Sequence, residues 1–168
     1  MLVFLALIIF AGLLIYAAAS DVVSYTIPNW LSVATFAAFP VLALAMGVPL
    51  MNIGWHVAFG VAILVAGFFL FQANIFGGGD AKLFAAASVW TGSVVFLPFL
   101  IWTALAGGVM GLSLLAARRF VPQSETNPAF VNHLLKEQNG IPYGVAMMAG
   151  GLLTLPTLLQ YFNALTLP

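Results

Sequence analysis

Long apolar segments with almost no charge between them restrict, more than any other feature, what this chain can fold into. Only 5% of its 168 residues are Asp, Glu, Lys or Arg, whereas 64% are hydrophobic. Because soluble domains carry about 25% charged residues, the four basic and four acidic residues of this chain are too few to cover a water-facing surface. The sequence therefore excludes a water-soluble globule and predicts a protein embedded in a lipid bilayer.

Six apolar runs are candidates for membrane-spanning helices, each of which needs roughly 20 apolar residues. They cover about residues 2–19, 30–46, 53–71, 81–90, 94–117 and 141–162. The run 81–90 is too short alone, and Thr91-Gly92-Ser93 after it is either a tight turn or a weak point within a longer helix. No Lys or Arg precedes the first run, so we expect a retained span rather than a signal peptide. The fold class expected is an all-α polytopic membrane protein of about six transmembrane helices, forming a single domain over residues 1–168.

The basic residues predict the orientation, because Lys and Arg mark the cytoplasmic side. With six spans and the N-terminus outside, three loops lie inside: residues 20–29, 72–80 and 118–140. All four basic residues then fall in or beside them: Lys82, Arg118, Arg119 and Lys136. The loop at about 118–140 is predicted to hold a short helix after Asn127 and Pro128. Since the net charge is zero and no basic cluster exists, nucleic acid is not an expected partner; the lipid bilayer is.

Two of the four acids sit at the ends of apolar runs. Asp21 follows the first run and Asp80 precedes the fourth, so the expected topology brings both to the same side and depth. Ionisable groups at membrane depth are costly and point to function. Two nearby carboxyl groups share a proton, so one can activate a water molecule while the other polarises a peptide carbonyl. Asp21, at the C-terminal end of its helix, is the expected holder of that proton, whereas Glu125 and Glu137 belong to the solvated loop.

Other interpretations of the two aspartates stay open at this point. Asp80 alone fits a helix N-cap, and Asp21 alone fits a turn at the membrane interface. A small proton-coupled transporter or channel would use Asp21 and Asp80 to relay protons. Such a protein is expected to spread its acids through the membrane, whereas both aspartates here lie at one end.

Three glycines, Gly77, Gly78 and Gly79, stand directly before Asp80, and the absence of side chains there lets a substrate backbone approach closely. The chain has no cysteine, so thiolate nucleophiles and cysteine-bound zinc are excluded. Its two histidines, His56 and His133, fall on opposite sides and are expected to be structural. We therefore expect no metal site and no cofactor.

These residues resemble the motifs of a known family. Gly77-Gly78-Gly79-Asp80 fits the Gly-x-Gly-Asp motif of intramembrane aspartyl proteases. Asp21 followed by Ile27-Pro28-Asn29 looks like the first aspartate motif of type IV prepilin peptidases, and Ile141-Pro142-Tyr143-Gly144 resembles their late Pro-Tyr/Phe-Gly element.

The resemblance implies an aspartic endopeptidase of the bacterial inner membrane. It would remove the leader of prepilins or pseudopilins at the cytoplasmic face, with Asp21 and Asp80 as the catalytic pair. The residues expected around the substrate are Gly77, Gly78, Gly79, Pro28, Asn29, Pro142, Tyr143 and Gly144. Larger members carry a cytoplasmic domain with Cys-x-x-Cys zinc ligands and also methylate the product. This chain is similar instead to the short peptidases of tight-adherence (Flp) pilus systems, so methyl transfer is not expected.

Overall fold

The computed structural model describes residues 1–121, 127, 129–135 and 140–166, and every regular element in these ranges is a helix. In chain order they are α1 (Leu2–Ser24), α2 (Asn29–Ala45), α3 (Leu50–Gln72), α4 (Gly78–Phe120), α5 (Ala129–Leu135) and α6 (Tyr143–Thr166). The prediction of an all-α chain is confirmed.

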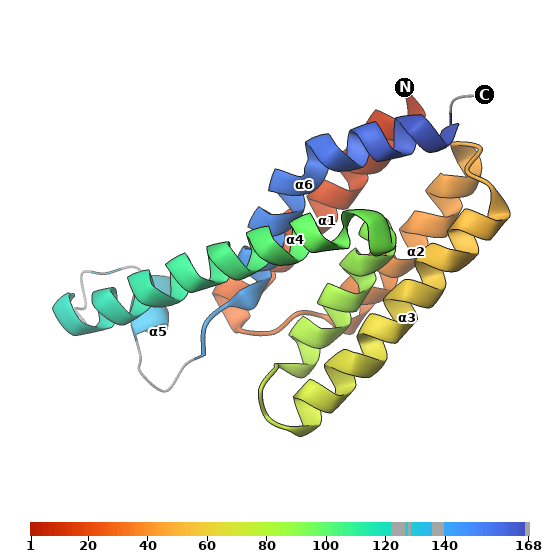
Figure 1. Ribbon diagram of the computed structural model, residues 1–168. Helices are drawn as coiled ribbons and strands as arrows, with labels where there is room; N and C mark the ends of the chain where they lie inside the picture. Colours follow the sequence, from red (N-terminus) through yellow and green to blue (C-terminus); the bar gives the residue numbers. More distant parts are fainter. Residues whose placement is uncertain (122–126, 128, 136–139, 167–168) are drawn as a thin grey trace.

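The helices form two groups joined through α4 (Figure 1). α1 and α6 lie side by side, and α4 packs mainly against α6 and α3. Both chain ends and the α2–α3 turn lie toward one end of the molecule, while the α1–α2 and α3–α4 connections lie toward the other. The connections that flank the two aspartates therefore share a side, as expected.

Four of these helices, α1, α3, α4 and α6, are long and apolar enough to cross a membrane, and α2 is a shorter apolar helix. The chain is therefore a multi-pass membrane protein. The structure does not support the expected count of six separate helices, because the predicted spans 81–90 and 94–117 are two arms of the 43-residue α4. Between them, the Thr91-Gly92-Ser93 segment forms a kink at the non-helical Gly92, where the two arms join directly.

The change of direction in α4 occurs at Gly92, whose backbone angles are φ 53° and ψ −169°. Glycine alone adopts this non-helical region readily, so two helical arms meet there at a kink. The ring of His56 fills the inside of the bend: a Cβ added to Gly92 would lie 2.7 Å from Cε1 of that ring. His56 Nδ1 donates to the carbonyl of Val89 at 2.7 Å, and the Tyr161 hydroxyl donates to Nε2 at 2.9 Å. These contacts fit the structural role expected for His56.

Gly92→Ala is expected to destabilise the protein by about 1–3 kcal/mol, because the methyl group strains a positive φ and collides with the His56 ring. The measurement is thermal unfolding in detergent, followed by circular dichroism. Gly54→Ala is the matched control, since a Cβ added there meets nothing within 4 Å. Equal unfolding temperatures for the two variants would contradict this account of the bend.

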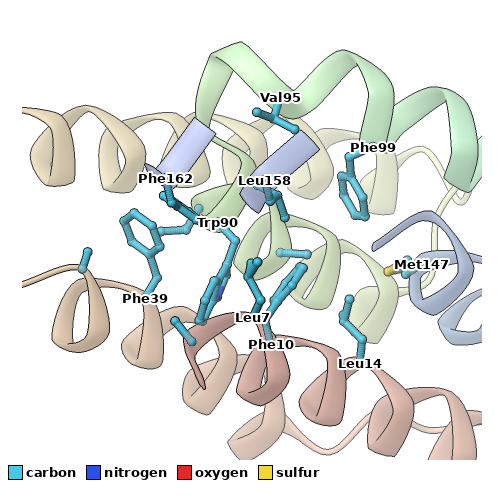
Figure 2. Close-up of a cluster of buried hydrophobic side chains, with 14 of the residues drawn as sticks. Leu7, Phe10, Leu14, Phe39, Trp90, Val95, Phe99, Met147, Leu158 and Phe162 are labelled. Atoms are coloured by element: carbon cyan, nitrogen blue, oxygen red, sulfur yellow. The ribbon is translucent and has the colours of Figure 1, made fainter. Parts of the chain in front are cut away.

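A buried aromatic cluster ties α1, α2, α4 and α6 together (Figure 2). Trp90, just before the bend, stacks on Phe10 with ring centroids 4.8 Å apart. The Trp90 Nε1–H donates to the carbonyl of Thr35 at 2.8 Å, which satisfies a donor that is otherwise fully buried. This cluster fixes the first arm of α4 against α1 and α2.

Small residues bring the second arm of α4 against α6, as the Gly107-xxx-Gly111 and Ala146-xxx-Gly150 patterns predict. A Cβ added to Gly107 would lie 3.5 Å from that of Ala146, and one added to Gly150 would collide with Thr103. The close packing fixes α6, whose first turn contributes to the site described below.

The loop between α4 and α6 contains the predicted short helix, α5. Arg118 holds it in place, because Nε donates to the carbonyl of Leu134 at 3.0 Å and Nη2 to that of Gly140 at 3.1 Å. Several predicted features of this loop lie outside the described residues: Glu125, Pro128, Lys136, Glu137 and the side chains of Phe130 and His133.

Candidate active site

Asp21 lies in the C-terminal part of α1 and is only 5% exposed. Its Oδ2 accepts a hydrogen bond from the backbone N–H of Gly144 at 2.7 Å, in the first turn of α6. A Cβ added to Gly144 would lie 3.0 Å from both Cβ and Oδ2 of Asp21. A buried helical position with this contact is not a turn at the interface, so that interpretation of Asp21 is wrong.

After α1 the chain turns, and hydroxyl groups of residues near the end of this helix stabilise the turn. Tyr25 ends the helix with φ 51°, and its N–H donates to the Asp21 carbonyl at 2.8 Å. Ser20 Oγ donates to the carbonyl of Thr26 at 2.9 Å, and Ser24 Oγ donates to the carbonyl of Ser20 at 2.7 Å. These bonds satisfy polar groups at the helix end and fold the connection back toward Asp21.

Asp80 is the third residue of α4 and lies in its first turn. The N-cap is Gly77, without a side-chain capping bond, so the interpretation of Asp80 as a helix cap is wrong. A Cβ added to Gly77 would lie 2.5 Å from Oδ2 of Asp80. Glycine at that position therefore leaves space for the carboxyl group.

The next two glycines, Gly78 and Gly79, begin α4 and let its first turn pack closely against α3 and the α1–α2 connection. A Cβ added to Gly78 would lie 3.2 Å from the Phe71 ring, and one added to Gly79 would lie 3.4 Å from Cβ of Ile27. The glycine run thus presses Asp80 close to the α1–α2 connection.

Both carboxyl groups line one cavity of about 400 Å³, and they are close enough for their charges to interact. The cavity is lined by Asp21, Tyr25, Thr26, Ile27, Asn29, Gly77, Gly78, Gly79, Asp80, Gly140 and Ile141. Of the residues expected around a substrate, the three glycines and Asn29 are in this lining. Gly144 instead binds Asp21, and Pro28, Pro142 and Tyr143 are not part of the lining.

Lys82 is outside this lining but contacts one of its residues, because its Nζ donates to Oδ1 of Asn29 at 2.9 Å. This bond joins the start of α2 to the first turns of α4. Lys82, expected mainly to mark the cytoplasmic side and otherwise to tune the charge of the site, therefore also binds a residue of the cavity lining.

Tyr25 and Ile141 are cavity residues that the sequence interpretation missed. Tyr25 is four residues after Asp21, a spacing that places it at the same helix end, and this was the available signal. Burial raises the pKa of the Tyr25 hydroxyl, and the positive charge of Arg118 offsets part of that rise.

Helix dipoles act on both carboxyl groups of the pair. Asp80 lies in the first turn of α4, and Asp21 accepts from the first turn of α6. Both helix ends favour an anion. The expectation that Asp21 holds the proton took the C-terminal end of α1 as the helix end nearest to it, whereas the N-terminal end of α6 acts on the same carboxyl group in the opposite sense. Among the described residues, no three His, Cys, Asp or Glu side chains are grouped to hold a metal ion.

One comparison with known proteins gives a match. A family model for type IV leader peptidases matches residues 8–112, which include both aspartates and the glycine run. No curated protein and no solved structure matches the chain. Because the match covers well over half of the 168 residues, the chain belongs to the type IV leader peptidase family.

Proposed function

We propose that this peptidase is an aspartic endopeptidase that removes the leader from prepilins or pseudopilins at the cytoplasmic face of the bacterial inner membrane. The observation that carries the proposal is that Asp21 and Asp80, from helices far apart in the sequence, line one cavity beside a glycine run. In a leader peptidase, two carboxyl groups that share a cavity are sufficient for peptide hydrolysis.

In the proposed mechanism, the ionised carboxyl of the pair takes a proton from a water molecule, whose oxygen attacks the scissile carbonyl carbon. The protonated carboxyl donates its proton to the carbonyl oxygen, so a neutral tetrahedral diol forms. The first carboxyl then returns its proton to the leaving nitrogen, while the diol hydroxyl gives one back to the second. The C–N bond breaks, and the pair ends with the single proton with which it began. Gly144 would hold Asp21 in position through its N–H.

We propose that both arms of α4 and the shorter α2 also cross the membrane, giving six crossings with the N-terminus outside. The basic residues support this orientation. Lys82 is near the start of α4 and Arg118 and Arg119 are at its end, so the two arms must return the chain to the same side for positive charges to stay cytoplasmic.

Cleavage tests the activity directly. The purified chain in detergent is expected to shorten a polypeptide made of a basic leader, a glycine and roughly 20 apolar residues, read as a mobility shift. Because carboxyl groups perform every proposed step, a metal chelator or a thiol alkylator should leave the rate unchanged. If the peptidase is folded but leaves the polypeptide uncut, the mechanism is wrong. It is also wrong if a chelator abolishes cleavage and added zinc restores it. Proton flux into vesicles without cleavage would favour the transporter alternative.

Thiol labelling tests the orientation, since the chain has no cysteine of its own. The Ser24→Cys and Gln123→Cys variants should resist an impermeant thiol reagent in intact cells. Met51→Cys is the control for the outer side, because Met51 is exposed in the first turn of α3 and should react. Rapid labelling of Ser24→Cys or Gln123→Cys would reverse the proposed orientation.

A further inference from the structure

A second cavity, of about 740 Å³, opens between the two arms of α4 and is bordered by α3 and the start of α6. Figure 1 shows the second arm of α4 running away from the first arm and α3. The lining contains aliphatic, aromatic and small side chains and no charged one. Its chemistry thus suits an apolar occupant.

This cavity adjoins the one that holds the carboxyl groups. Ile141 lines both cavities. Phe76 and Tyr143, whose ring centroids are 6.1 Å apart, also line the apolar cavity. Both flank the catalytic loops, since Phe76 precedes the glycine run and Tyr143 precedes Gly144. One end of the apolar cavity therefore lies beside the cavity that Asp21 and Asp80 line.

The apolar cavity follows the second arm of α4 over a long distance. Leu100 and Leu115 both line it, and fifteen residues of helix extend about 22 Å at roughly 1.5 Å per residue. This length is most of a hydrocarbon core of about 30 Å. A helical segment of the membrane would fit along it.

Gly108 marks a place where such a helix could approach closely. Its neighbours Gly107 and Gly111 are explained by internal packing, because Cβ atoms added there would lie 3.2 Å from Tyr143 and Ile141. Gly108 lines the cavity, yet a Cβ added to it meets nothing within 4 Å. Glycine weakens a helix interior, and no contact within the described structure requires it here. Small residues facing open space are the surfaces on which membrane helices pack.

We propose that the apolar cavity is the groove that binds the apolar segment of the substrate, as a helix, directly after the scissile bond. The inference rests on the proposed function, since a leader peptidase must hold a substrate whose apolar segment stays in the membrane while its leader reaches the carboxyl groups. The groove supplies that arrangement: it is uncharged over its length and meets the catalytic cavity at Ile141.

Disulfide cross-linking tests the position of the substrate. The probe is the same leader, glycine and apolar polypeptide, with one cysteine in the middle of its apolar segment. Under mild oxidation, the Gly108→Cys variant should cross-link to the probe at least tenfold more than the Gly54→Cys variant, whose glycine is equally open but lies away from the groove. Equal yields, or dimers of Gly108→Cys that the probe does not suppress, would overturn the proposal; dimers would assign the groove to a second copy.

Filling the groove gives an independent test. Gly108→Leu should lower, at least tenfold, the ratio of kcat/KM for the full polypeptide to that for a short soluble peptide with the same scissile bond. Gly54→Leu should leave this ratio unchanged. An unchanged ratio in Gly108→Leu refutes the groove and leaves the proposed function standing. Absence of cleavage by the unmodified chain refutes the proposed function, and the cross-linking result then still decides the groove.

Discussion

Asp21→Asn and Asp80→Asn are each expected to lower leader cleavage by at least about 10³-fold, while the protein still inserts and accumulates. Asparagine keeps the size of the side chain, and at position 21 its carbonyl oxygen still accepts the Gly144 N–H. It cannot exchange the proton that the pair must pass to and from the substrate. The measurement is the mobility shift of prepilin to mature pilin, with the amount of membrane-inserted enzyme determined in parallel.

The double variant should be no less active than either single variant, because removal of one carboxyl group already disables the pair. Glu125→Gln and Glu137→Gln are the controls; their positions are in the polar loop of the sequence, and near-normal cleavage is expected. Substantial cleavage by either single aspartate variant would falsify the catalytic pair.

Gly144→Ala is expected to lower kcat by up to roughly 10²-fold, the effect that a displacement of about 1 Å would have. The added methyl group would lie 3.0 Å from Oδ2 of Asp21 and 3.3 Å from the carbonyl of Ala17. The carboxyl group must therefore shift by a few tenths of an ångström relative to its N–H donor. Steady-state kinetics on the purified variant provides the measurement.

Gly12→Ala in α1 is the control for this prediction, because a Cβ added there meets nothing within 4 Å. Both variants should unfold near the temperature of the unmodified chain. A kcat for Gly144→Ala equal to that of Gly12→Ala would show that the Asp21 contact does not position the carboxyl group.

The helical class could be predicted from the sequence because lipid exposure leaves a local signal in composition. The bend at Gly92 could not be predicted, since the sequence Thr91-Gly92-Ser93 suits either a turn between two helices or a bend within one. The structure shows a kink between two helical arms, with the ring of His56 from another helix packed against Gly92.

The shared cavity of Asp21 and Asp80 could be anticipated from their common helix end and the three glycines. The donor to Asp21 could not be predicted from the sequence, because Gly144 is 123 residues away. A backbone N–H is also present in every residue except proline, so the residue type at position 144 gives no signal of this bond. Tyr143 and Pro142, expected around the substrate with Gly144, are instead outside the carboxyl cavity. Neighbouring residues of this motif thus face different cavities, because α6 begins within the motif at Tyr143.

The hydrogen bond between Asp21 and Gly144 also imposes an order on the synthesis and assembly of the protein. Ribosomes add about 5–20 residues per second, so the 123 residues that separate the two positions take roughly 6–25 s to synthesise. During that interval α1 can already lie in the membrane, but the N–H that holds its carboxyl group does not yet exist. A nascent chain that stalls before α6 therefore lacks the donor to Asp21, and under the proposed function we expect cleavage only after α6 has been inserted.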